Sequence, residues 1–266
     1  MGDHMNTKHN SRFRMLYGSV TTIGIAVIGL GLYRVIHDQT PAIWIAMALL
    51  AAIAGSFSLK IPGINGRVSA GDTIICLSIL ILGPYCGAIS ASVDAVVGSL
   101  RCKTSSRRLQ FALYNAGSSA LSAFVVGQVL LHLPGGPTAH LQILPSISLL
   151  GLCVMAGIYF LLNTTLVAAA VALESSRSFI EVWQKGFMWT CVNYVVGAFV
   201  AGFLAQLAGS LSPAKLGAIL FSCTAVYVSC RAYVRIAKIA EGRENTEHVQ
   251  PCGKSSRPLI ASVEIP

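Results

Sequence analysis

The chain has 266 residues, of which 54% are hydrophobic and only 11% are charged, and its mean hydropathy is +0.68. A soluble globular domain carries about 25% charged residues, so this composition excludes a chain built of soluble domains. The net charge of +9 would suit a nucleic-acid partner. In a chain this apolar, basic residues more simply mark cytoplasmic loops, and we expect no nucleic-acid partner.

Eight cysteines are scattered through the sequence, mostly inside apolar runs, and no C-x-x-C pair occurs. Such spacing predicts neither a metal site nor a disulfide framework. A buried cysteine that packs as a small hydrophobe is sufficient to explain them. We therefore expect no metal and no cofactor.

Apolar runs of about 20 residues, the length of a membrane-spanning helix, follow one another along the chain. The sequence divides into a basic cytoplasmic N-terminus (1–14), a transmembrane domain (15–239) and a polar, disordered cytoplasmic tail (240–266). The first apolar run is too long for the core of a cleaved signal peptide. We expect about eight helical segments, at 16–36, 41–59, 72–82, 85–100, 109–131, 143–173, 186–208 and from Pro213 to about Val234.

The third and fourth segments decide the topology, because each is short for a hydrocarbon core of about 30 Å. They meet at Gly83-Pro84 and form either one long helix kinked at Pro84 or a hairpin of two short helices. With a hairpin and a cytoplasmic N-terminus, only Arg34 and Lys215 among the basic residues lie outside. The positive-inside rule therefore favours the hairpin, with both termini in the cytoplasm.

The segment 143–173 is too long for one upright crossing, so it either tilts or breaks near Asn163. The following stretch, 174–185, is predicted to be an amphipathic cytoplasmic loop. Trp183 and Trp189 lie where interfacial aromatic residues are expected.

Asp94 carries the strongest signal for a binding residue, because a carboxylate in the middle of an apolar segment is costly unless it is partnered or faces water. It could hold a ligand, a cation or a proton inside the bundle. It could equally make a helix-to-helix hydrogen bond that fixes the short hairpin. Asp72 more simply caps the segment 72–82 at the membrane surface, near Arg67.

Amide side chains inside the apolar segments predict a polar patch in the interior of the bundle. For each amide alone, a hydrogen bond between helices is favoured over a ligand contact. Taken together they make a small-ligand pocket plausible, so Asn115, Asn163 and Asn193 join Asp94 and Asp72 as candidate ligand-binding residues. The amides are Asn115, Gln128, Asn163, Asn193 and Gln206.

Small residues at Gly117-Ser118-Ser119, Gly197 and Gly202 are interpreted as points of close helix packing. A serine nucleophile at position 118 or 119 would need a neighbouring base. The histidines outside the termini are expected in outer loops, so no catalytic residue and no enzymatic activity is predicted.

Several short motifs resemble the N-terminal membrane region of bacterial signalling proteins that carry a GGDEF diguanylate cyclase or an HD-GYP phosphohydrolase domain. The resemblance extends over about residues 15–248. It is carried by 57–72 (FSLKIPGINGRVSAGD), 82–85 (LGPY), Asp94, the basic run 101–108, 159–164 (YFLLNT), Glu174, Trp183, Trp189, 193–194 (NY) and 231–233 (RAY).

The resemblance implies a sensory region without its output domain, since neither a GGDEF nor an HD…GYP signature occurs. We therefore expect a multi-pass sensory input module of the bacterial inner membrane that lacks its own catalytic domain. Its partners besides the lipid bilayer would be a second copy and a separate signalling output protein. The alternative is a small-solute transporter or its substrate-binding membrane subunit, because interrupted helices often hold substrate at mid-membrane.

Overall fold

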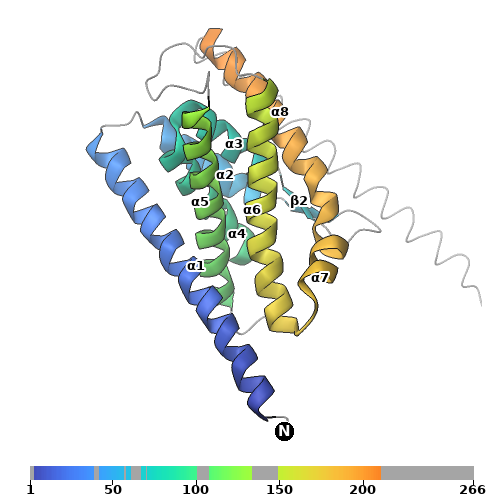
Figure 1. Cartoon of the computed structure of the whole chain (residues 1–266). Helices are drawn as coiled ribbons and strands as arrows, with labels where there is room; N and C mark the ends of the chain where they lie inside the picture. The colour runs from blue at the N-terminus through green and yellow to red at the C-terminus, as the bar shows by residue number, and fades with distance from the viewer. Residues whose placement is uncertain are drawn as a thin grey trace, which may run out of the picture. The chain divides into compact units, whose positions relative to one another are not determined.

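The computed structural model describes residues 3–38, 42–56, 58–60, 67–69, 71–100, 108–133 and 149–210. These residues form a predominantly helical fold, as the composition predicts (Figure 1). The predicted segment after Pro213, the basic run 101–107 and the tail lie outside the described residues. The elements are α1 (Asp3–His37), α2 (Ile43–Gly55), β1 (Ser58–Lys60), β2 (Arg67–Ser69), α3 (Gly71–Leu82), α4 (Pro84–Leu100), α5 (Arg108–His132), α6 (Leu149–Ser175), α7 (Phe179–Gly186), the 3₁₀ helix η1 (Met188–Thr190) and α8 (Cys191–Ser210).

The strands β1 and β2 depart from the purely helical prediction. They pair antiparallel, with Leu59 opposite Val68. The helix expected at 41–59 accordingly spans only Ile43–Gly55. The glycine at 55 disfavours a continuing helix, and residues 58–60 are extended because they pair in β1, which explains the earlier end.

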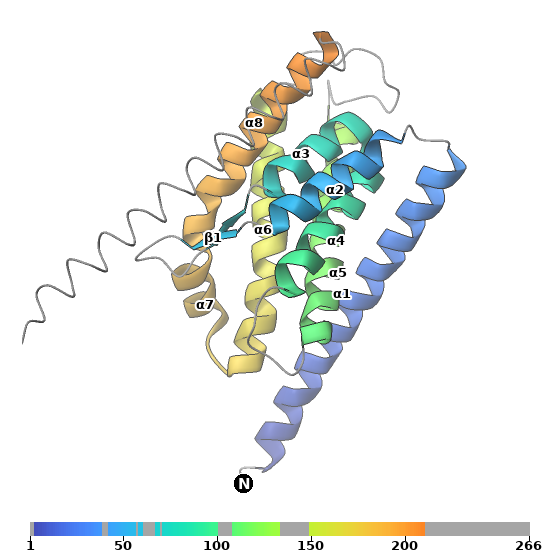
Figure 2. The same ribbon diagram turned by 180° about the vertical axis from the view of Figure 1, so that it is seen from behind.

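The chain reverses between α3 and α4, so the hairpin prediction is correct and the single kinked helix is wrong (Figure 2). Ser90 Oγ lies 3.2 Å from Ser78 Oγ across the two helices. A Cβ placed on Gly87 would collide with the Ile79 side chain. Gly83 makes the reversal with a φ of 89°, a left-handed conformation that glycine adopts without steric cost.

Small residues allow close helix packing at the predicted positions. A Cβ on Gly24 of α1 would lie 2.5 Å from the carbonyl carbon of Gly117 in α5. A Cβ on Gly202 of α8 would lie 2.7 Å from Leu152 in α6, so the helices touch there as well. The interpretation of these glycines as packing positions is therefore confirmed.

The helix α6 runs without interruption from Leu149 to Ser175, so the alternative of a break near Asn163 is wrong. The stretch expected as a loop at 174–185 is partly helical, because α7 occupies Phe179–Gly186. The segment predicted to begin at residue 186 is interrupted by η1, and its regular helix starts only at Cys191.

Two helices of the described part are long and apolar enough to cross a membrane, Phe13–His37 within α1 and Leu149–Ser175. The pair α7 and α8, bent by 56°, makes a third if it counts as one span. The helices α2 and α3 are apolar but shorter. Membrane association is thus supported by the helices themselves, whereas eight crossings are not established by helix length.

Gly83→Ala should lower the free energy of unfolding by about 1–3 kcal/mol, because an L-residue is strained at this φ. Gly29→Ala in α1 is the matched control, since a Cβ meets nothing within 4 Å at either position. The measurement is reversible unfolding in mixed micelles followed by circular dichroism. Equal stability of the two variants would contradict a left-handed turn at Gly83.

Candidate ligand site

The carboxylate of Asp72 accepts a hydrogen bond from Nδ2 of Asn193 and so joins the start of α3 to the start of α8. Asp72 lies in the first turn of α3 and is partly buried between helices. The expectation of a simple cap at the membrane surface therefore needs correction, because the side chain bonds across the bundle. The acidic group still lies favourably near the positive end of the α3 dipole.

A second set of hydrogen bonds begins at the neighbouring residue of α8. Tyr194 accepts a hydrogen bond of 2.7 Å at its hydroxyl from Nδ2 of Asn163 in α6. Oδ1 of Asn163 lies 3.4 Å from the Ser119 hydroxyl in α5, which donates to it. The first turn of α8 is therefore tied to α3 through Asn193 and to α6 and α5 through Tyr194.

Aromatic side chains support this polar layer from within the core. The ring of Tyr159, which is only 1% exposed, lies edge-on to Tyr194 at a centroid distance of 5.2 Å. Phe160 contacts Tyr194 at 5.7 Å and Trp183 of α7 at 5.9 Å. Edge-to-face packing of this kind fixes the ring of Tyr194, and hence the position of its hydroxyl.

Asp94 lies in α4, with its carboxylate against two glycines of neighbouring helices. A Cβ on Gly71 of α3 would fall 2.6 Å from Cγ of Asp94, and a Cβ on Gly55 of α2 would fall 2.7 Å from Oδ1. Oδ1 is buried and has no hydrogen-bond partner among the described residues. Asp94 therefore occupies a niche that exists only because positions 55 and 71 lack side chains.

The fold brings together four of the five candidate ligand-binding residues, but of the five amides expected to form the polar patch only Asn163 and Asn193 join them. Asp72, Asn193 and Asn163 belong to one layer, and Asp94 joins it through Gly71, the residue before Asp72. Asn115 takes a different role, because its Nδ2 donates a 2.9 Å hydrogen bond to Ser99 of α4. That contact is the helix-to-helix bond that sequence reasoning favoured for an isolated amide.

Sequence reasoning missed Tyr194, Ser119 and Thr164 as members of the polar layer. Thr164, the residue after Asn163, accepts a 3.1 Å hydrogen bond from Nε1 of Trp183. Tyr194 directly follows a candidate amide, and Tyr194 and Thr164 both fall in motifs of the family resemblance, 193–194 (NY) and 159–164 (YFLLNT), that had assigned them no role. Within the described ranges no three His, Cys, Asp or Glu side chains are grouped as metal ligands.

A comparison with protein families identifies one match. The family model of MASE9, a family of membrane-associated sensory domains, matches residues 40–230, more than two thirds of the chain. This range contains every residue of the polar layer. Neither the curated proteins nor the solved structures contain a match.

Gly71→Ala should destabilise the protein by about 1–3 kcal/mol, because the added methyl group collides with the Asp94 carboxyl group. In an Asp94→Ala background the same change should cost much less, with a coupling of roughly 0.5–3 kcal/mol. Gly98→Ala in α4 is the control, since its nearest neighbour lies 3.7 Å away. Additive losses in a double-mutant cycle of unfolding free energies would refute the niche.

Proposed function

We propose that this chain, which belongs to the MASE9 family, is a multi-pass sensory input module of the bacterial inner membrane. Family membership supports a membrane sensory role. The single structural observation that carries the proposal is the polar layer in which α8 is tied to α3, α5 and α6. In this proposal the chain catalyses nothing itself and passes its signal to an output domain of the GGDEF or HD-GYP kind, with a second copy of the chain as a further partner.

The proposed ligand is a small polar molecule that binds at Asp94, Asp72, Asn163 and Asn193. Hydrogen-bonding groups on such a ligand would compete for the Asn193–Asp72 and Tyr194–Asn163 bonds. Replacing those bonds would favour a different position of α8 relative to α3 and α6. The free energy by which the ligand shifts this equilibrium cannot exceed the difference between its binding free energies for the two arrangements. Asn115 would act indirectly, because its hydrogen bond to Ser99 holds α5 against α4, the helix that carries Asp94.

We also propose about eight segments with both termini in the cytoplasm. The contacts of α1 support this orientation for the first five helices, because the Tyr17 hydroxyl donates to the carbonyl of Gln110 and the two rings of Tyr17 and Tyr114 stack at 5.3 Å. The start of α5 thus lies beside the N-terminal half of α1. In this proposal the hairpin of α3 and α4 returns the chain to the side from which it entered, so α5 begins on the same side of the membrane as α1.

Cysteines placed at positions 12 and 103 should be labelled from the same side of the membrane, and a cysteine at position 132 from the other side. The measurement is labelling by a membrane-impermeant maleimide in sealed inverted vesicles, with the native cysteines replaced by alanine. His132 serves as the control because it lies at the far end of α5 and is exposed. Labelling of 12 and 103 from opposite sides would overturn the topology.

The alternative of a small-solute transporter remains a proposal with one observation in its favour. The interrupted pair α3 and α4 places Asp94 in a buried niche, and broken helices of this kind often surround transported substrates. A transporter must release its ligand on the opposite side of the membrane, whereas a sensor need only bind it. Uptake therefore separates the two functions.

The full chain in lipid nanodiscs should be stabilised by at least one compound class in a panel of amino acids, amines, organic acids, sugars and nucleosides. A ligand at 100 times its dissociation constant adds about 2.7 kcal/mol of stability, which a thermal melt resolves. Asn193→Leu should abolish the shift, because it removes the bond to Asp72. Gln206→Leu, which changes an exposed amide of the same helix, should leave the ligand-induced rise in melting temperature intact.

The compound that stabilises the chain should change the turnover of a diguanylate cyclase fused to its C-terminus without being taken up by proteoliposomes. Saturable uptake would favour the transporter. Either an unresponsive melt across the whole panel or a full response in Asn193→Leu would refute the proposed site.

A further inference from the structure

The short helix α7 has one polar side and one apolar side, and the apolar side is only partly covered by the protein. The polar side carries Glu181 and Lys185, whose side chains form an exposed ion pair of 2.9 Å. The apolar side carries Phe179, Ile180 and Trp183 within about a third of the helix circumference. Ile180 is 62% exposed and Phe179 39% exposed, so the described residues cover this apolar flank only in part.

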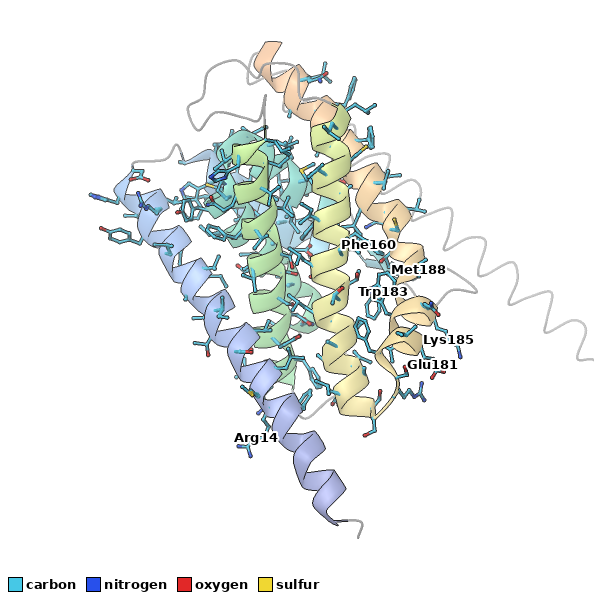
Figure 3. The ribbon with its side chains drawn as sticks, viewed as in Figure 1. Arg14, Phe160, Glu181, Trp183, Lys185 and Met188 are labelled. Atoms are coloured by element: carbon cyan, nitrogen blue, oxygen red, sulfur yellow. The ribbon has the colours of Figure 1, made fainter. Side chains whose placement is uncertain are left out.

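The orientation of α7 is fixed by its contact with α6. Trp183 donates its 3.1 Å hydrogen bond to Thr164, and its ring lies against Phe160. Figure 3 shows Trp183 between α7 and α6, with Glu181 and Lys185 on the opposite side of α7. Rotation of α7 to bury Ile180 against α6 would break the Trp183 contacts, so the flank stays turned outward.

Contacts between helices place α7 at the depth where α1 enters the membrane. Arg14 is the last basic residue before the apolar run of α1. Tyr17, one turn later, stacks on Tyr114, and the Tyr114 hydroxyl donates a 2.7 Å hydrogen bond to the carbonyl of Leu166. Leu166 therefore lies near the level of the membrane boundary. Thr164, which anchors Trp183, is only two residues away on α6.

From this placement we propose that the apolar flank formed by Phe179 and Ile180 binds the boundary between lipid headgroups and acyl chains, while Glu181 and Lys185 face water. The occupant is phospholipid, because Trp183 holds α7 against α6, a helix long and apolar enough to cross a membrane, and Leu161, three residues before Thr164 on the membrane side, is 51% exposed. A tryptophan beside the flank is typical of this boundary region, and apolar faces of amphipathic helices insert there. The proposal does not depend on the sensory function.

The test uses the full chain reconstituted into phosphatidylcholine vesicles, with Trp44→Phe and Trp189→Phe so that Trp183 is a constant background. Ile180→Trp and Lys185→Trp are matched probes on the apolar and polar sides of the same helix, since five residues of a helix turn by about 140° beyond one full turn. Lipids brominated near the headgroup end of the acyl chain should quench Trp at 180 about twofold more than lipids brominated near the terminal methyl, as expected for shallow insertion. Acrylamide should quench Trp at 185 preferentially.

Two results would overturn the proposal. Quenching of both probes by acrylamide would show that α7 stands in water. Protection of the probe at 180 from both acrylamide and brominated lipid would show that another protein segment or a second copy covers the flank. If Ile180→Trp loses helical circular dichroism relative to Lys185→Trp, Phe179→Trp reports on the same flank with a smaller change in volume.

Discussion

The reversal of the chain at Gly83 is the constraint on which the rest of the bundle depends. In the proposed topology this turn lies within the membrane and must satisfy its own backbone groups, since lipid offers no hydrogen-bond partners. Here the amide of Gly83 bonds to the carbonyl of Ile79 at 3.0 Å, and the amide of Gly87 bonds to the carbonyl of Gly83 at 3.1 Å. The two short helices can therefore pair, and this pairing brings Gly71 opposite Asp94.

The start of α8 is the second organising feature, because two adjacent residues reach different helices. Neighbouring positions on a helix point about 100° apart, so Asn193 can reach Asp72 of α3 while Tyr194 reaches Asn163 of α6. A tilt of α8 would alter both hydrogen bonds together. This geometry makes α8 the helix whose position best reflects the state of the polar layer.

Features governed by local rules could be predicted from the sequence. The hairpin followed from Gly-Pro and the charge distribution, and close packing at Gly117 and Gly202 followed from side-chain size. The partner of Asp72 could not be predicted, because it lies 121 residues away in the sequence. A buried carboxylate needs a hydrogen-bond donor, but any buried amide could have supplied one. The strands β1 and β2 were missed since three residues are too few for an alternating pattern to register.

The strength of the polar layer limits what it can do in signalling. Interhelical hydrogen bonds in membranes average about 0.6 kcal/mol, so the two bonds of α8 together change an equilibrium by roughly a factor of eight. Moving a population from 1:99 to 99:1 requires about 5.5 kcal/mol. The two bonds can bias α8 but cannot hold it in place, so in the proposed mechanism most of the switching free energy comes from a ligand that distinguishes the two positions. Because Thr164 follows Asn163 directly on α6, a displacement of Asn163 would also reach Trp183 of α7, which donates a hydrogen bond to Thr164.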